Sequence, residues 1–364
     1  MTAPSLYVAI SSHGFGHLAQ TAPVVNVLAE RNPRLRVVVQ CALPSEVLRA
    51  HLRVPFDHID ESPDIGMRMA DSLDVRSEAT FSAYEELHRD WSRQVEREAR
   101  RLRDLAPDFV LSNIAYLPLA AAAAADIPSA ALCSLNWAEC FLAYCHGYAG
   151  ADVIYREMLA AYGEAETFFN PAPSMAMPGL DNIQAVGPIA RLGRDRREEL
   201  HDRLGLDRGV HLVVVSLGGI FTALPIERWE ITPSTRFIVS GTEVPRRPDV
   251  SALEATGMPF IDVLASADAI VTKPGYGTFA EAACNGAPLL YVRRTVWPEE
   301  PYLVNWLRQH ARCGELSRGQ LHAGRFHDDL EALWNAAARP KVKPTGVGDI
   351  VAALAPRLFD ADEP

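Results

Sequence analysis

Residues 260–288 read FIDVLASADAIVTKPGYGTFAEAACNGAP, and the order of patterns within them decides the fold. Residues 269–272 are a short apolar run, 273–278 are glycine-rich, and 279–284 have a helical pattern. This order predicts a strand, a turn and a helix, the repeating unit of a parallel α/β sheet. The glycines let the backbone approach a ligand, and the free N–H groups at the helix start favour a diphosphate. Lys273, which precedes the glycines, adds a positive charge there.

The same alternation of short apolar runs and amphipathic stretches continues through both halves of the chain. A chain of 364 residues is too long for one ordinary core. The sequence therefore predicts an α/β chain of two doubly wound domains, residues 1–186 and 187–347, with a C-terminal helical segment at 348–364 that can pack back on the first domain. Residues 187–200, rich in charges with glycine and proline, are expected to be an exposed interdomain connection. Strands are expected at 6–11, 36–41, 109–113, 129–134, 211–217, 236–240, 269–272 and 288–292, and helices at 17–31, 45–52, 78–105, 118–126, 279–284 and 348–358.

The composition of the chain bears on which partners it can bind and on the cell compartment in which it is expected. A formal net charge of −11 argues against nucleic acid or an anionic membrane as the main partner, because both require a basic face. The six cysteines include no CxxC pair, which is typical of a reducing compartment and speaks against a zinc site. No signal peptide is recognisable, and the longest apolar stretch, 117–125, is too short to span a membrane. We therefore expect a cytoplasmic protein with no transmembrane segment.

Residues 272–278, TKPGYGT, followed by Glu281, Gly286 and Pro288, resemble the donor-binding signature of GT-B glycosyltransferases. Examples are plant and macrolide-type UDP-sugar transferases and the lipid II-forming N-acetylglucosaminyltransferase. The resemblance implies two Rossmann-like domains facing across a cleft, with the nucleotide-sugar on the second. It implies that the glycine-rich turn and Thr278 hold the diphosphate, Glu281 the ribose and the backbone of Phe260 and Ile261 the base. The implied donor-binding residues are Ser216, Gly218, Gly219, Phe260, Ile261, Lys273, Gly275, Tyr276, Gly277, Thr278 and Glu281, with Glu299 and Glu300 as candidates for the sugar hydroxyls.

Two features of this signature leave alternatives open. Thr278 and Glu281 also have the spacing of a helix capping box, with Thr278 as N-cap and Glu281 three residues later. The family often has an Asp-Gln or Gln-Gln pair where this chain reads WPEEPYLVN at 297–305, so the register between Glu299 and Glu300 is ambiguous. Arg293 and Arg294 precede this stretch and can meet a phosphate, the acceptor or the surface.

In the first half, the strand at 6–11 runs into SHGFGHLA at 12–19. Read as G-x-G-x-x-A, this fits a dinucleotide fingerprint, but the second strand ends VQCA at 39–42 without the acid that would bind a ribose. Gly16 to Leu18 instead resemble the segment of plant transferases whose histidine deprotonates the acceptor hydroxyl. At a helix start the positive dipole end lowers the pKa of His17 and favours the neutral imidazole that a general base requires.

The resemblance departs from the plant enzymes at the partner of this histidine. Residues 107–113 read PDFVLSN, which puts Asn113 where those enzymes carry an Asp. Asn113 can fix the tautomer of His17 but cannot stabilise imidazolium by charge. Three explanations stay open: a weaker base, replacement by a carboxylate such as Glu139, or an acceptor that is already an anion or an amine. Residues expected on the acceptor side are His13, Gly14, Phe15, Asn136 and Trp137, with core packing an equal alternative for Trp137.

These patterns predict an inverting, metal-independent glycosyltransferase that moves a sugar from a nucleotide-diphosphate donor, UDP-sugar first, to a small-molecule or lipid-linked acceptor. The catalytic residues would be His17 and Asn113, and no cofactor is expected beyond the nucleotide-sugar co-substrate. The alternatives are a nucleotide-sugar epimerase or hydrolase on the same fold, and a non-catalytic nucleotide-sugar-binding module. Residues 14–17, GFGH, also resemble the transferase-like portion of sugar kinases such as arabinokinase.

Overall fold

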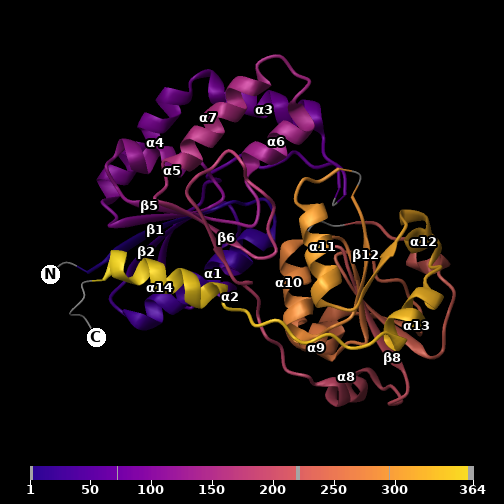
Figure 1. Cartoon of the computed structure of the whole chain (residues 1–364). Helices are drawn as coiled ribbons and strands as arrows, with labels where there is room; N and C mark the ends of the chain where they lie inside the picture. Colours follow the sequence, from indigo (N-terminus) through magenta and orange to yellow (C-terminus); the bar gives the residue numbers. More distant parts are fainter. Residues whose placement is uncertain (1–2, 72, 219–221, 295, 360–364) are drawn as a thin grey trace.

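The computed structural model describes residues 3–71, 73–218, 222–294 and 296–359. Within these ranges the chain forms two parallel β-sheets, of seven and six strands, with helices on both faces of each (Figure 1). This arrangement confirms the predicted α/β fold of two doubly wound units.

The first unit comprises seven strands and seven helices among the described residues, with the strands in the order β3-β2-β1-β4-β5-β6-β7. The crossover from the β3 side to β4 is the point where the strand order reverses, which is where doubly wound sheets bind ligands. Its elements are β1 Ser5–Ile10, α1 Phe15–Arg31, β2 Arg36–Gln40, α2 Ser45–His51, β3 Phe56–Ile59, α3 Ser77–Arg89, α4 Trp91–Leu105, β4 Phe109–Asn113, α5 Leu117–Ala124, β5 Ser129–Leu132, α6 Trp137–Cys145, α7 Ala151–Gly163, β6 Thr167–Pro171 and β7 Ile183–Val186.

The second unit has the strand order β10-β9-β8-β11-β12-β13 within the described residues, so β8 and β11 lie side by side at its centre. Its elements are α8 Arg197–Leu204, β8 His211–Ser216, η1 Ile226–Arg228, β9 Thr235–Ser240, β10 Val250–Ala252, η2 Leu253–Thr256, α9 Phe260–Ser266, β11 Ala269–Thr272, α10 Tyr276–Asn285, β12 Leu289–Val292, α11 Glu300–His310, β13 Cys313–Leu316, α12 Arg318–Ala323 and α13 His327–Asn335, followed by α14 Gly346–Leu358.

The central strands are apolar on both sides because helices cover both faces of each sheet. In β1, Leu6, Val8 and Ile10 share a buried cluster with α1, whereas Tyr7 and Ala9 pack on the other face with α4 and α5. In β8 the residues alternate in the same way between one cluster containing α9 and α10 and another containing α13. The first of these clusters continues from α1 to α10, so the two units share apolar core where these two helices meet.

The largest differences from the predicted helices are a break in one helix and an earlier start in another. The stretch predicted as one helix at 78–105 is two helices, α3 and α4, which meet at Asp90, where φ is −122° and ψ is 42°. Helix α10 begins at Tyr276, three residues before the predicted start, because Gly275 rather than Thr278 is its N-cap. Gly277 and Thr278 therefore belong to the first helical turn.

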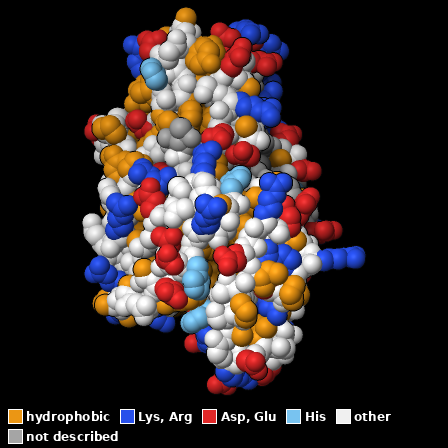
Figure 2. Space-filling view, turned by 90° about the vertical axis from the view of Figure 1, so that its right-hand side faces the viewer, with side chains coloured by type: hydrophobic (Ala, Val, Ile, Leu, Met, Phe, Trp, Pro, Cys, Tyr) orange, Lys and Arg blue, Asp and Glu red, His pale blue; other side chains and the backbone are white. Residues whose placement is uncertain are grey.

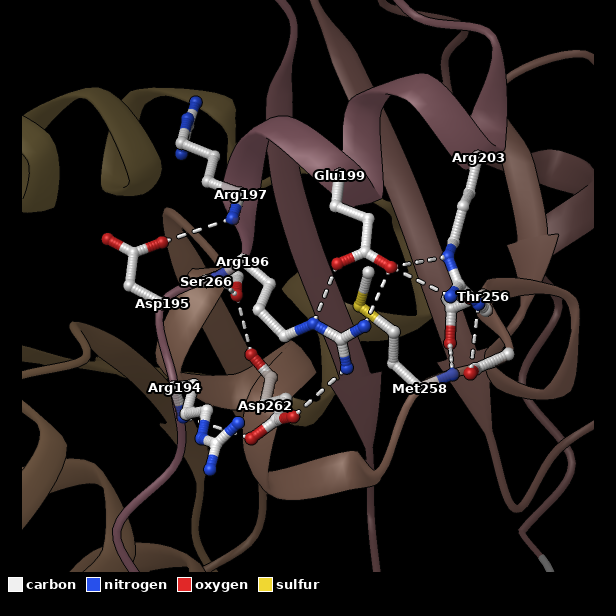
Figure 3. A network of polar contacts seen from close by, with 11 residues as sticks. Arg194, Asp195, Arg196, Arg197, Glu199, Arg203, Thr256, Met258, Asp262 and Ser266 are labelled. Carbon is white, nitrogen blue, oxygen red and sulfur yellow. Dashed lines mark hydrogen bonds and ion pairs between the residues drawn. The ribbon is translucent and has the colours of Figure 1, made fainter.

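The connection between the two units is held tightly by the second one (Figure 3). The backbone N–H of Arg194 donates to Asp262 Oδ1 at 2.9 Å, and that of Arg196 donates to Ser266 Oγ at 2.8 Å. The Arg196 guanidinium also pairs with Glu199 at 2.6 Å and with Asp262 at 3.3 Å. The charges in this segment thus serve to fasten the chain to α8 and α9 as it enters the second sheet.

Helix α14 crosses back to the first unit and packs against α1 (Figure 1). The return segment runs beside the outgoing one: Gly187 N donates to Asp349 Oδ2 at 2.9 Å, and Gly346 N donates to Pro188 O at 3.1 Å. Figure 2 shows one face of the molecule, on which basic and acidic side chains are interspersed. Among the described residues, helices that combine the length and the apolar character needed to cross a membrane are absent.

Candidate active site between the two sheets

The carboxyl ends of the two sheets meet around a hydrogen bond between the units. Ser134, which follows β5, donates from Oγ to Glu299 Oε1, at the start of α11, over 2.6 Å. Loops at the carboxyl ends of parallel strands are the usual ligand site of doubly wound domains. Ser134 and Glu299 thus join the carboxyl end of the first sheet to that of the second.

His17 lies in the first turn of α1 and is hydrogen-bonded to Asn113 at the end of β4. The Nδ1 atom of His17 is 2.9 Å from Asn113 Oδ1. The Asn113 amide nitrogen donates to the His17 carbonyl at 3.3 Å and to Gln20 Oε1 at 3.2 Å, which fixes the amide orientation. Because Asn113 Oδ1 can only accept, Nδ1 of His17 carries the proton and Nε2 carries the lone pair. Nε2 has no hydrogen-bond partner in the described part of the chain.

The chain of hydrogen bonds continues from His17 to the second unit. After Asn113 and Gln20, the Gln20 amide donates to Ser134 Oγ at 3.2 Å, and Ser134 donates to Glu299. Every donor in this series points the same way and the series ends at a carboxylate. Aligned chains of this kind polarise one another in a low-dielectric interior. Glu139, considered above as a replacement for the missing carboxylate, instead accepts from the Tyr155 hydroxyl at 2.9 Å.

Both site histidines are neutral at cellular pH because of where they lie. Burial, followed by the nearby His13, lowers the pKa of His17 to about 4, which the Asn113 hydrogen bond only partly offsets. Burial likewise lowers the pKa of His13 to about 4, with further lowering from Arg294 and Lys273 of the second unit. His13 Nε2 is 3.0 Å from the Met67 carbonyl, so Nε2 donates. His17 therefore presents a free basic nitrogen, the state that a general base requires.

Trp137 is a fully buried support for the two histidines rather than an open stacking surface. Its indole lies edge-on to His13 and His17, with ring centroids 5.1 and 5.6 Å apart respectively. Its Nε1 donates to Asp64 Oδ2 at 2.7 Å, and burial raises the pKa of Asp64 to about 6. Asp64 was not anticipated from the sequence, because it lies in the irregular segment after β3 with no recognisable motif.

The remaining residues expected on the acceptor side have distinct surroundings. Gly14, with φ of 90°, is the N-cap of α1. The next residue, Phe15, is the first of that helix and exposes 46% of its surface. Asn136 is buried and caps α6, its Oδ1 accepting from the Glu139 backbone at 2.8 Å. Asn136 is therefore engaged in shaping the helix, whereas Gly14 and Phe15 are accessible.

In the second unit, Lys273 lies between two glycine-containing turns. Its Nζ is 3.5 Å from the position that a Cβ on Gly218 would occupy and 3.9 Å from the corresponding position on Gly275. Burial, followed by the nearby Arg294, lowers the pKa of Lys273 to about 7, and no ion pair to it is found among the described residues. The predicted residue Gly219 lies outside the described residues. Ser216 ends β8 beside Ser240 of β9.

The start of α10 is open where a ligand would approach. A Cβ on Gly277 would meet nothing within 4 Å, and no side chain caps the first turn. Tyr276 points away from this turn: its hydroxyl accepts from the Ile189 backbone at 2.8 Å, so it holds the interdomain segment. The free N–H groups of this turn and the Lys273 side chain thus lie together as a cluster of hydrogen-bond donors, the kind of group that anions prefer.

Glu281 is paired with an arginine, and the capping-box alternative is wrong. Its carboxylate accepts from Arg191 Nε at 2.7 Å, while the N-cap of α10 is Gly275. Only 6% of Glu281 is exposed, and burial raises its pKa above the usual range. Phe260 and Ile261 form the first turn of α9, and the Ile261 carbonyl is covered by Gly193, on which a Cβ would lie within 2.1 Å of that oxygen.

The structure separates the roles of the two adjacent glutamates. Glu300 turns into its own unit, accepting from Arg293 Nε at 2.9 Å and from the Arg294 backbone at 3.1 Å. Glu299 faces the first unit through Ser134, and it also accepts from Trp297 Nε1 at 3.3 Å. Burial raises the pKa of Glu299, whereas the positive charges of Arg294 and Lys273 lower it in part. Glu299 is thus the glutamate that belongs to the region shared by the two sheets.

Comparison of the sequence with known proteins finds a curated relative of different length. No protein-family model matches the chain. It is 26% identical over 328 residues to L-arabinokinase of Arabidopsis thaliana, which covers 88% of this chain but only 31% of that protein. The chain thus spans about a third of the length of this curated relative.

Solved structures are similar over nearly the whole chain. The calicheamicin glycosyltransferase CalG4 is 17% identical with a TM-score of 0.59, over 98% of this chain and 94% of its own. S. aureus MnaA, solved with UDP, is 11% identical with a TM-score of 0.59, over 99% of both chains. With the two facing sheets described above, these likenesses establish the GT-B fold predicted from the sequence.

Proposed function

We propose that this GT-B chain is an inverting, metal-independent glycosyltransferase that moves a sugar from a UDP-sugar to a small-molecule or lipid-linked acceptor. The observation that carries the proposal is that groups suited to bind a diphosphate and a group suited to accept a proton lie on two units in contact. An unpaired Lys273 and the open start of α10 form an anion seat in one unit. A neutral His17 with a free Nε2 lies in the other, whose α1 packs against α10.

The proposed reaction is a single displacement. The acceptor oxygen attacks the anomeric carbon while the bond from that carbon to the diphosphate oxygen breaks, which inverts the configuration. The acceptor proton goes to Nε2 of His17, and Asn113 holds the ring so that Nε2 faces outward with its lone pair. The departing diphosphate takes the electron pair and is stabilised by Lys273 and the N–H groups of α10. Because these groups supply positive charge, the proposed reaction requires no metal ion.

Support for a UDP-sugar comes from the comparisons and from Glu281. MnaA was solved with UDP, CalG4 is a glycosyltransferase, and the curated relative is named for a sugar substrate. In this proposal Glu281 binds the ribose hydroxyls, and the ion pair with Arg191 favours the ionised form of its carboxylate. We also propose that the protein is cytoplasmic. Its domains in this proposal are residues 1–186 and 187–347, followed by a C-terminal helical segment at 348–364.

Donor binding is tested by thermal shift and calorimetry with UDP. At 100 times its dissociation constant UDP should stabilise the intact chain by about 2.7 kcal/mol. Lys273→Ala and Glu281→Ala should each weaken binding by about tenfold or more, since hydrogen bonds to charged groups are worth about 1.5–3 kcal/mol. The exposed Lys343→Ala and Glu254→Ala serve as matched controls and should bind UDP as the intact chain does. If UDP and related nucleotides leave the intact protein unshifted, the donor assignment fails.

Ribose recognition by Glu281 can be separated from a structural ion pair. UDP should bind more tightly than 2′-deoxy-UDP to the intact protein, and Glu281→Ala should remove that difference. A variant that is less stable yet keeps the full preference for UDP would restrict Glu281 to its ion pair with Arg191.

The rival assignments differ in their products. A non-catalytic module is favoured by one observation, the neutral Asn113 beside His17. For a transferase, His17→Ala should leave UDP affinity unchanged and abolish transfer, the product should have the opposite anomeric configuration to the donor by NMR, and EDTA should leave the rate unchanged. Conversion of the donor sugar without any acceptor would indicate an epimerase or hydrolase.

A further inference from the structure

Arg294, which follows β12, has two buried guanidinium nitrogens and stacks on Trp297. Its guanidinium carbon lies 4.4 Å from the centre of the Trp297 ring. Its Nε and Nη1 atoms are buried, and neither has a hydrogen-bond partner among the residues that the structure describes. A charged donor that is buried without a partner is rare, because its desolvation is costly.

The carboxylates closest in sequence do not serve this guanidinium. Glu300 accepts from the Arg293 side chain and from the backbone, not the side chain, of Arg294. Glu299 accepts from Ser134 and Trp297. Burial accordingly lowers the pKa of Arg294, although both glutamates act in the opposite direction. The Nε and Nη1 groups of Arg294 are thus left without an acceptor among the described residues.

The surroundings of Arg294 place it on the side of the first unit. Trp297, on which it stacks, belongs to the buried cluster of the first unit, with Met67 and Phe141. Tyr144 of α6 has its ring centroid 6.5 Å from that of Trp297, and its hydroxyl interacts electrostatically with Arg294. Lys273, by contrast, lies between the glycines of the second unit. The two cations are near enough for the Arg294 charge to lower the pKa of Lys273, but only Arg294 stacks on a ring of the buried cluster of the first unit.

We infer that Arg294 is a specificity-determining residue that binds an anionic group, carboxylate or phosphate, carried by the acceptor. The inference rests on the proposed transferase function. Arginine matches both groups because its planar fork donates two parallel hydrogen bonds.

The test measures the binding of matched acid and neutral probes to the full chain, with and without UDP. Benzoate against benzamide probes a carboxylate, and phenyl phosphate against phenol probes a phosphate. The acid of at least one pair should bind about tenfold more tightly than its neutral partner. Arg294→Gln should reduce this preference to less than about twofold, and Arg294→Lys should retain part of it, because lysine keeps the charge and loses the fork. Arg156→Gln, an exposed arginine on α7, should behave as the intact chain does.

Each outcome supports or overturns the inference separately from the proposed function. Equal binding of acid and neutral probes by an intact chain that binds UDP overturns the inference and leaves the transferase proposal standing. A tenfold loss of UDP affinity in Arg294→Gln with no effect on the acid probes overturns it too, since Arg294 would then bind the donor. An intact chain that binds the acids selectively but never UDP supports the anion site and removes the transferase proposal.

Discussion

Ser134 donates a 2.6 Å hydrogen bond across the boundary between the two units to the carboxylate of Glu299. This contact ends the series that begins at His17 and passes through Asn113 and Gln20. The orientation of the candidate base is thus connected to the relative placement of the two sheets.

Ser134→Ala should destabilise the chain by about 1–3 kcal/mol, because one oxygen of a buried carboxylate loses its donor. Denaturant unfolding at neutral pH would measure the loss. In a Glu299→Gln background the same substitution should cost less, since a neutral amide needs its donor less than a carboxylate does. Equal losses in both backgrounds would mean that the serine acts by packing alone.

Asn113→Asp should raise the pKa of His17 by about one unit or more, because a carboxylate within hydrogen-bond reach favours the imidazolium. The present value is about 4, with burial as its main cause. NMR titration of the histidine resonances measures the change. Asn113→Ala is the control and should give no increase, since it adds no charge. An unchanged value in the aspartate variant would show that the two side chains are not in contact.

UDP affinity should fall by roughly tenfold between pH 6.5 and 8.5, because a lysine with a pKa of about 7 loses its proton over that window. The sign follows from the charge: only protonated Lys273 attracts the diphosphate, so binding is strongest below its pKa and takes up a proton. Calorimetry in buffers of different ionisation enthalpy measures that uptake. Lys273→Met should bind more weakly at pH 6.5 and show a flat profile. A profile unaltered by the substitution would assign the pH dependence elsewhere.

Gly277→Ala should stabilise the fold by about 0.5–1 kcal/mol yet weaken UDP binding. The added Cβ meets nothing within 4 Å, and alanine is the better helix residue. In the bound state the same methyl group would occupy the space expected for the diphosphate. Gly348→Ala, equally open and in the first turn of α14, should raise the melting temperature without changing UDP affinity. Unchanged UDP binding in Gly277→Ala would place the diphosphate away from this turn.

Much of the fold could be predicted from the sequence because buried parallel strands are continuous apolar runs. The strands at 109–113 and 269–272 were predicted to the residue. The short strands β3, β6, β7, β10 and β13 were missed, since each includes polar residues and lacks a long apolar run. The break at Asp90 was also missed, because the charged pattern on either side of it is equally helical.

The site could be predicted only where its residues fall in one short motif. The loops holding His17 and Lys273 are local patterns, and the structure brings their elements together. The supports come from elsewhere in the chain: Asp64 reaches Trp137, Arg191 reaches Glu281, and Gln20 reaches Ser134. Such contacts depend on packing between distant segments, for which sequence spacing gives no signal. The start of α10 was misplaced because the capping pattern at Thr278 competes with the correct glycine cap.

The paired outgoing and returning segments at Gly187 and Gly346 limit how the two halves of the molecule can move. A single tether would let one half swivel freely about the other. Here two neighbouring crossings are joined by hydrogen bonds, Gly187 to Asp349 and Gly346 to Pro188, and together they restrict rotation more than one crossing would. A rotation of one unit relative to the other about these crossings would have to break the hydrogen bond between Ser134 and Glu299.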